Sequence, residues 1–424
     1  MVCLLSVWCL KKGLFSFLRS SSSLCGRFID EDCLWYISFS NDMLQLYIYR
    51  DYLTLFGAAM SCCCDTKGLN NGANILAVIF DLDGTLLDTG RAVRGVLDEF
   101  LAKYGKKLDM EKEEKKRLGM TLKESAAIFV KDYDLPMTPD QFIKEMTPFY
   151  RERWANAKAL PGANRLIKHL RKNGVPMALA SNSCHDYIEA KISHHKGWKE
   201  SFSVILGSDQ VKSGKPSPYL FEEAAKKMGV DAANCLVIED SLVGVKAAYA
   251  AKMKVVAVPS RKEADCNVLA DIVLHSLLEF QPQLWGLPPF DDWVDKALPI
   301  EPIHLSGLYV NGSLHETTGN ATFSLPDQLV GLYFGWAAVD ADRNLKILVS
   351  INLDHLPGFA NKKIHVCLID SNSDHKSEQK MLIHLVGYIR ALDNKELTST
   401  ELEKLEEDKS IARASLDLPS FSYF

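Results

Sequence analysis

The sequence predicts an α/β fold: a Rossmann-like parallel sheet with an inserted α-helical cap, followed by a small β-barrel-like domain. Two observations predict the sheet and its cap. After about residue 73, short apolar runs alternate with amphipathic segments, and the stretch between residues 90 and 160 is helix-prone and has no strand signal. A third observation, a succession of strand signals after about residue 300, predicts the β domain.

The predicted strands of the sheet are apolar or β-branched along nearly their whole length, as is typical of strands covered on both faces. They span residues 75–80, 176–180, 203–206, 236–238 and 255–258. The helices predicted between them span residues 161–172, 218–228 and 242–251, and those of the cap span 91–106, 112–131 and 141–155. In the β domain we expect strands at residues 332–338, 347–351, 364–368 and 381–389, before a final charged helix.

These patterns divide the chain into four parts. Residues 1–72 are an unassigned extension with no sustained helix or strand period, and both a transit peptide and an upstream extension before a true start at Met60 are open interpretations. Residues 73–285 form the α/β domain, with its cap at about 90–160. Residues 286–299 are a linker, and residues 300–424 form the β domain.

Composition excludes several classes of protein. The 49 Lys and Arg residues nearly balance the 54 Asp and Glu residues, which argues against a strongly basic nucleic-acid-binding protein. No apolar run approaches the ~18–20 residues that a membrane span requires. Seven of the 11 cysteines lie in the first 64 residues, and the other four are too dispersed for a zinc site. We expect a cytoplasmic protein with free thiols, and organelle targeting by residues 1–59 stays open.

The end of the first predicted strand carries the strongest chemical signal. Asp81 and Asp83 follow the apolar run directly and are themselves followed by Gly84 and Thr85. In extended backbone, this spacing points both carboxylates to the same side, at the edge of a parallel sheet where ligands bind. Two adjacent carboxylates repel each other unless a cation lies between them, so the pair predicts Mg²⁺. One carboxylate can then attack phosphorus to give an aspartyl-phosphate while the other transfers the leaving-group proton.

Three further motifs follow later predicted strands. Ser181 and Asn182 offer a hydroxyl group and backbone N–H groups suited to phosphate oxygens. Lys215 precedes a predicted helix and can neutralise both phosphate and nucleophile. Glu239 and Asp240 end the fourth strand as an acidic pair, and Asp240 would complete the cation site.

These motifs, in this order, resemble the haloacid dehalogenase superfamily of phosphohydrolases, and the insertion resembles the cap of its first subfamily. The resemblance implies the HAD fold and a Mg²⁺-dependent phosphomonoester hydrolase. It implies that Asp81 is the nucleophile, Asp83 the general acid/base and Lys215 an electrostatic stabiliser. Phosphate contacts are implied for Ser181, Asn182 and Lys215, and metal contacts for Asp81, Asp83, Glu239 and Asp240.

Residues 160–170, residues 197–200, the linker and the β-rich end together resemble the plant bifunctional riboflavin kinase/FMN phosphatases. This resemblance covers residues 74–424 and implies hydrolysis of FMN to riboflavin and phosphate, with a C-terminal barrel that takes riboflavin and ATP. A phosphatase for small sugar or polyol phosphates remains an alternative, since the cap selects the substrate.

The expected kinase half departs from that family's pattern. The segment from Gly312 to Gly319 is poor in glycine, and the family's Pro-Thr-Ala-Asn sequence is missing. His365 stands where the family has its catalytic glutamate, and histidine is a poor substitute for a carboxylate beside Mg²⁺. We therefore expect an impaired kinase; an active riboflavin kinase and a flavin-binding module are the alternatives.

Overall fold

The computed structural model describes residues 16–20, 23–30, 33–40, 43–49, 74–109, 120, 122–260, 266, 268–315, 325–339, 343–353, 362–370, 378–392 and 399–422. The chain divides into two compact units, Met1–Asn71 and Gly72–Phe424. Among the described helices, none combines the length and the apolar character that crossing a bilayer would require.

The first unit contains an antiparallel sheet in the order β1-β2-β3-β4. Its strands are β1 (Ser16–Ser20), β2 (Ser23–Asp30), β3 (Cys33–Ser40) and β4 (Met43–Tyr49). The sequence of residues 1–72 shows no sustained strand period, so these strands are not predicted. In β3, apolar and aromatic residues occupy consecutive positions, so the two-residue alternation that marks a half-buried strand does not appear.

The second unit begins with the predicted parallel sheet, which has the strand order β10-β9-β8-β5-β6-β7. Its strands are β5 (Ala77–Phe80), β6 (Met177–Ser181), β7 (Val204–Gly207), β8 (Cys235–Glu239), β9 (Lys254–Ala257) and β10 (Ile272–Val273). The α/β fold class is therefore confirmed. β10 was not predicted, since two residues are too few to form a pattern. Because β5 lies between β6 and β8, the carboxyl ends of these three strands meet at one edge.

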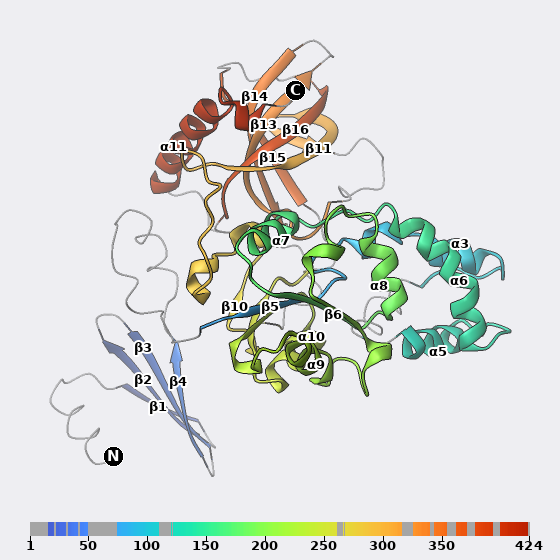
Figure 1. Ribbon diagram of the computed structural model, residues 1–424. Coiled ribbons are helices and arrows are strands. Elements are labelled where there is room, and N and C mark those ends of the chain that lie inside the picture. The colour runs from blue at the N-terminus through green and yellow to red at the C-terminus, as the bar shows by residue number, and fades with distance from the viewer. Residues whose placement is uncertain are drawn as a thin grey trace. The chain divides into compact units, whose positions relative to one another are not determined.

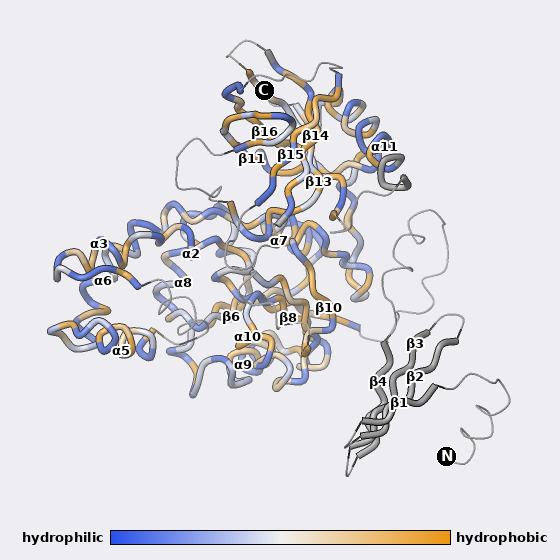
Figure 2. The backbone as a smooth tube through the Cα atoms, turned by 180° about the vertical axis from the view of Figure 1, so that it is seen from behind, coloured by the Kyte–Doolittle hydropathy of each residue, from blue (hydrophilic) through white to orange (hydrophobic). Residues whose placement is uncertain are grey.

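Helices cover both faces of the sheet (Figure 1). On one face of the sheet, Val78 and Phe80 of β5 pack against helices α7 (Ala163–Lys172) and α8 (His185–Ile192). Ala77 and Ile79 point to the other face, where α9 (Tyr219–Met228) and α10 (Leu242–Ala250) pack. Apolar side chains are therefore needed at every position of β5, which explains its uninterrupted apolar sequence. Along the cap helices, by comparison, apolar and polar residues are interspersed (Figure 2).

The cap is inserted between β5 and β6 and has its own core. Its helices are α2 (Thr89–Ala92), α3 (Val96–Ala102), α5 (Leu122–Asp132) and α6 (Pro139–Trp154). The single helix predicted at 91–106 is divided because Gly95 adopts a left-handed backbone with φ of 82°. Much of the helix predicted at 112–131 lies outside the described residues. The ring of Phe142 packs against Phe100 and Phe129, with centroids 5.3 Å and 4.7 Å apart.

The C-terminal part forms a closed barrel, in the order β11-β12-β15-β14-β13-β16. Its strands are β11 (Leu298–Val310), β12 (Ser313–His315), β13 (Gly331–Val339), β14 (Arg343–Leu353), β15 (Lys362–Leu368) and β16 (Gln379–Arg390). Helix α11 (Ser399–Ser415) packs against its outer surface. We did not predict β11, because Pro299 and Pro302 interrupt its apolar pattern; the pairing with β16 shifts register between Pro299 and Ile303.

Candidate active site

Asp81 follows β5 directly and is buried, with 6% of its surface exposed. Its backbone N–H donates to the carbonyl of Ile238 at 3.0 Å, which ties the end of β5 to β8. Its Oδ1 accepts a hydrogen bond from Lys215 Nζ at 2.6 Å. An oxygen of Asp81 is thus held at the sheet edge beside a positive charge.

Glu239 is a second carboxylate that pairs with the ammonium group of Lys215. Its Oε1 accepts from Lys215 Nζ at 2.7 Å, and its Oε2 accepts from the backbone N–H and the hydroxyl of Ser241 at 2.8 Å and 2.9 Å. Gly244 leaves room for this carboxylate, because a Cβ atom there would overlap it. Burial opposes the charge on Lys215, but Asp81 and Glu239 raise the pKa of Lys215 above its usual range, so it remains an ammonium group.

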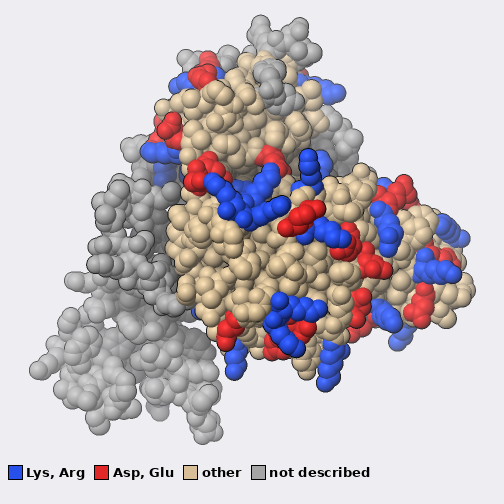
Figure 3. All heavy atoms as spheres, viewed as in Figure 1, with Lys and Arg blue, Asp and Glu red and all other residues tan. Residues whose placement is uncertain are grey.

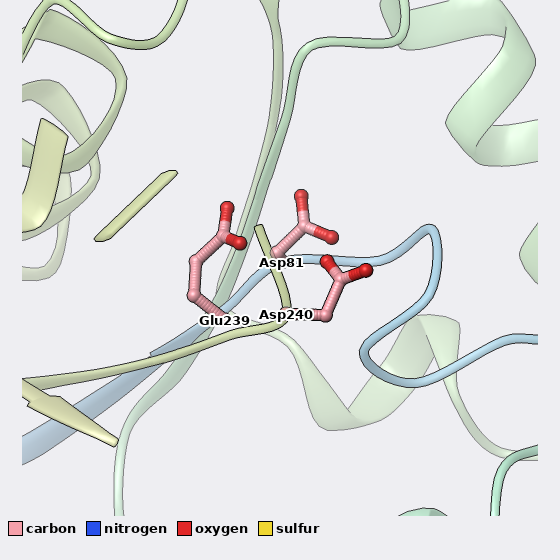
Figure 4. Close-up of side chains that lie close together, drawn as sticks. All are labelled: Asp81, Glu239 and Asp240. Atoms are coloured by element: carbon pink, nitrogen blue, oxygen red, sulfur yellow. The ribbon is translucent and has the colours of Figure 1, made fainter. Parts of the chain in front are cut away.

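Asp81, Glu239 and Asp240 form the one cluster of potential metal ligands found among the described residues. Each offers a carboxylate oxygen, and these oxygens lie within 4.8 Å of one another. Figure 4 shows the three side chains at the ends of two neighbouring strands. Burial raises the pKa of Asp81 to about 7, with Lys215 opposing the rise and Glu239 adding to it. Burial, together with Glu239 and Asp81, raises the pKa of Asp240 as well.

These residues fit a hard divalent cation such as Mg²⁺. The cluster holds three carboxylates against one ammonium, that of Lys215, so its fully ionised form carries an excess of negative charge. A divalent ion would remove this excess, and oxygen ligands are those that Mg²⁺ prefers. Glu239 already accepts three hydrogen bonds, from Lys215 and from the N–H and hydroxyl of Ser241, which leaves Asp81 and Asp240 as the freer ligands.

Thr85 lies between these two aspartates. Its hydroxyl is 3.2 Å from Asp81 Oδ2 and 3.2 Å from Asp240 Oδ1. Because a hydroxyl group has one hydrogen, it can donate fully to only one carboxylate at a time. No role is predicted for Thr85 from the sequence, although its place directly after Gly84 in the predicted turn is a signal for one.

Asp83 takes a different position from the one predicted. Its carboxylate is not part of the acidic cluster; instead, Lys191 Nζ donates to both of its oxygens, at 2.7 Å and 2.8 Å. The hydroxyls of Ser183 and Ser181 donate to Oδ2 at 2.9 Å and 3.4 Å. Burial would raise the pKa of Asp83, but Lys191 and hydrogen bonds from Thr89 and Ser183 hold it below its usual value. Lys191 and the serine hydroxyls therefore hold the Asp83 carboxylate in its ionised form, apart from the acidic cluster.

Asn182, a predicted phosphate contact, uses its side chain to hold Lys215. Its Oδ1 accepts from the backbone N–H of Lys215 at 2.8 Å, and its Nδ2 donates to the Lys215 carbonyl at 3.1 Å. Gly214 permits this approach, since a Cβ atom there would lie 2.5 Å from Asn182 Oδ1. Ser181, the other predicted contact, accepts from the Ser183 backbone at 3.1 Å.

Lys191 was missed because a single lysine near a helix end is usually solvated, and only the packing reveals its burial. Its side chain is 5% exposed, and its Nζ lies 5.0 Å from the ring centroid of Trp154 on cap helix α6. The ring of Trp154 also packs against Tyr187 of α8 at 4.9 Å, and Tyr187 shares a hydrogen bond with Thr147 of α6. Lys191 is thus enclosed where the cap meets the sheet domain.

The fold and site are those of a haloacid dehalogenase-like phosphatase. A family model of haloacid dehalogenase-like hydrolases matches residues 78–258, which include all the site residues described above. The chain is 45% identical over 362 residues to the bifunctional riboflavin kinase/FMN phosphatase of Arabidopsis thaliana, a match that covers 82% of this chain and 94% of that protein. The chain therefore belongs to the family of bifunctional riboflavin kinase/FMN phosphatases, as its sequence motifs predicted.

Shorter relatives match the phosphatase part. (DL)-glycerol-3-phosphatase 2 of Arabidopsis thaliana is 36% identical over 230 residues, covering 52% of this chain and 94% of that protein. Among solved structures, CbbY from Rhodobacter sphaeroides in complex with phosphate is 27% identical with a TM-score of 0.44, covering 48% of this chain and 96% of that chain.

Proposed function

We propose that this phosphatase hydrolyses FMN to riboflavin and phosphate through an aspartyl-phosphate on Asp81. The observation that carries the choice of FMN is the 45% identity to a riboflavin kinase/FMN phosphatase over nearly the whole of that relative. The site supports the chemistry, since a buried carboxylate and a second carboxylate in a separate hydrogen-bond network both follow β5, and the ammonium group of Lys215, from the segment after β7, contacts the first.

In the first half-reaction, Asp81 attacks phosphorus and the bond from phosphorus to the ester oxygen breaks. Asp83, which Lys191 holds ionised in the free enzyme, takes up a proton from solvent when the anionic substrate binds and then gives it to the departing oxygen of the alcohol. Lys215 lies against the attacking carboxylate and limits the charge that builds up between carboxylate and phosphate. In the second half-reaction, a water molecule attacks phosphorus, Asp83 takes its proton, and Asp81 is released as a carboxylate.

We assign Mg²⁺ to the acidic cluster, with Asp81 and Asp240 as its side-chain ligands. Glu239 holds Lys215 beside them. When bound, the ion would neutralise phosphate charge and orient the phosphoryl group. Asp83, predicted as a fourth ligand, enters the proposal through proton transfer, because its carboxylate is paired with Lys191.

A panel of phosphomonoesters tests the substrate. We expect FMN to give the highest kcat/KM in the presence of Mg²⁺, with activity lost on adding EDTA. The matched control is Asp81→Asn, which keeps the shape of the side chain. An FMN rate no greater than that for glycerol 3-phosphate would reject FMN and favour the alternative of a small polyol phosphate, for which the similarity to glycerol-3-phosphatase 2 is the supporting observation.

For the barrel, we propose an impaired riboflavin kinase. His365, at the position of the family's catalytic glutamate, lies on β15, and its Nδ1 contacts the hydroxyl of Ser313 at 3.2 Å. Incubation of the full chain with riboflavin, ATP and Mg²⁺ tests this, with the Asp81→Asn background preventing loss of product. Formation of FMN at an enzymatic rate would reject the proposal, whereas flavin binding without turnover would identify the barrel as a binding module.

A further inference from the structure

One hydrogen bond connects the barrel to the phosphatase's catalytic loop, which we define as residues 81–88. Gln328, in the segment between β12 and β13, donates from its Nε2 to the backbone carbonyl of Gly84 at 3.1 Å. Gln328 is 5% exposed, so the donor of this part-buried bond is shielded from water. Gly84 stands between Asp83 and Thr85, two residues whose side chains contact the groups of the active site.

The catalytic loop has little freedom at Gly84. Its φ of +90° favours glycine, and a Cβ atom there would overlap the carboxylate of Asp240. The Gly84 N–H donates to the carbonyl of Leu87 at 2.8 Å, which closes the turn. The N–H groups of Leu86 and Leu87 in turn donate to the carbonyl of Leu82. A shift of Gly84 would therefore move the loop against Asp240 and displace Thr85.

The barrel is attached firmly enough for this bond to act as a fixed support. Leu277 is 1% exposed in the hydrophobic core of the sheet, and the next residue, Leu278, is 5% exposed in the core of the barrel. The linker that leads into the barrel is held against α7 as well: Arg165 pairs with both carboxylate oxygens of Asp292 at 2.7 Å, and its guanidinium lies 3.5 Å from the ring centroid of Phe290. Basic side chains gather over α7 beside acidic ones in Figure 3.

We propose that the barrel supplies Gln328 as a positioning residue for the phosphatase, so that turnover at Asp81 depends on a contact made by the other half of the chain. Gln328 acts through Gly84, whose carbonyl it fixes, and does not touch the acidic cluster. The barrel therefore has a role in phosphate hydrolysis whatever its kinase activity. This inference rests on the proposed function, because it assigns a further residue to that reaction.

The test compares two full-length variants. Gln328→Met keeps the length of the side chain and removes the donor, whereas Glu301→Ala removes the contacts of Glu301 with Asn164 Nδ2 at 3.0 Å and 2.8 Å, which also join the barrel to α7. With p-nitrophenyl phosphate and Mg²⁺, we expect Gln328→Met to lower kcat about tenfold with KM nearly unchanged, because small displacements of reacting groups reduce rates steeply. Glu301→Ala should retain the parental kcat.

Hydrogen–deuterium exchange of the catalytic loop provides a readout that does not need activity. We expect the amides of residues 82–88 to exchange faster in Gln328→Met than in Glu301→Ala, while exchange in the barrel strands stays equal and shows that both variants fold. A parental kcat in Gln328→Met together with unchanged loop exchange would overturn the inference. An equal loss of kcat in Gln328→Met and Glu301→Ala would overturn it as well. If the parent hydrolyses no phosphomonoester, the proposed function fails, and loop exchange alone still decides whether Gln328 supports the loop.

Discussion

Lys191 Nζ lies 2.7 Å and 2.8 Å from the two carboxylate oxygens of Asp83, and the ring of Trp154 covers the same ammonium group at 5.0 Å. Three separate parts of the chain meet in this arrangement: helix α8, the catalytic loop and cap helix α6. The charge state of the proposed acid/base therefore depends on a lysine that the cap shields from water. A movement of α6 would change the environment of Asp83 without any change in the loop itself.

The first prediction concerns this ion pair. Lys191→Met should raise the pKa of Asp83, because the main opposing charge is lost, and should destabilise the fold by about 3 kcal/mol, as expected for breaking a buried pair. The pH profile of kcat should shift to higher pH, and Lys191→Arg should restore most of the parental profile. Steady-state kinetics across pH checks both variants. A parental profile in Lys191→Met would show that Lys191 has a structural role only.

The second prediction concerns Thr85. Thr85→Val keeps the shape of the side chain but removes the hydroxyl that lies 3.2 Å from both Asp81 and Asp240. The hydroxyl orients the two proposed ligands, so we expect its loss to lower Mg²⁺ affinity by about tenfold. Isothermal titration with Mg²⁺ measures this, and Thr85→Ser, which keeps the hydroxyl, should bind like the parent. Equal Mg²⁺ affinities in the parent, Thr85→Val and Thr85→Ser would contradict a role for the Thr85 hydroxyl at the metal site.

The third prediction concerns Asn182. If its side chain serves to hold Lys215, as its bonds of 2.8 Å and 3.1 Å to the Lys215 backbone indicate, Asn182→Ala should lower kcat with little change in KM. If it contacts substrate phosphate instead, KM should rise. Kinetics with p-nitrophenyl phosphate distinguish the two roles, and the melting temperature of the variant controls for loss of the fold.

The fourth prediction concerns pH and metal. Because the folded chain raises the pKa of Asp81 from 3.8 to about 7, the metal-free protein is most stable at low pH with respect to this group and loses that stability as the pH rises through about 7. Mg²⁺ binds the ionised carboxylates, so it should raise the melting temperature by ~3 °C or more at about pH 8 and by much less at about pH 5.5. Thermal unfolding with and without Mg²⁺ at both pH values gives the answer. An equal increase in melting temperature at both pH values would show that Mg²⁺ binding does not depend on the ionisation of Asp81.

The central residues could be predicted because topology fixes where strands end. Asp81, Lys215 and Asp240 all come shortly after strands of one parallel sheet, so their proximity followed from the strand pattern before any coordinates. The same argument could not give the direction of each side chain. Asp83 was expected beside Asp81 at the cation, and a lysine from α8 draws its carboxylate elsewhere.

The rest depended on packing that a single sequence does not encode locally. The burial of Lys191 depends on where the cap docks, and the contact of Gln328 with Gly84 depends on how the barrel meets the sheet domain, 244 positions away along the chain. The barrel strand β11 was missed for a local reason, since its two prolines resemble a linker. The contacts of Lys191 and Gln328 each join parts of the chain that lie far apart in the sequence.

The central claim is that Asp81 carries the phosphoryl group, and its most direct measurement is chemical trapping during turnover. The full chain is mixed with FMN and Mg²⁺, quenched in acid and treated with borohydride, which reduces an aspartyl-phosphate to homoserine. Peptide mass spectrometry should then find homoserine at position 81, and none in Asp81→Asn. Steady hydrolysis of FMN with an unmodified Asp81, or with the phosphoryl group on another residue, would contradict the account.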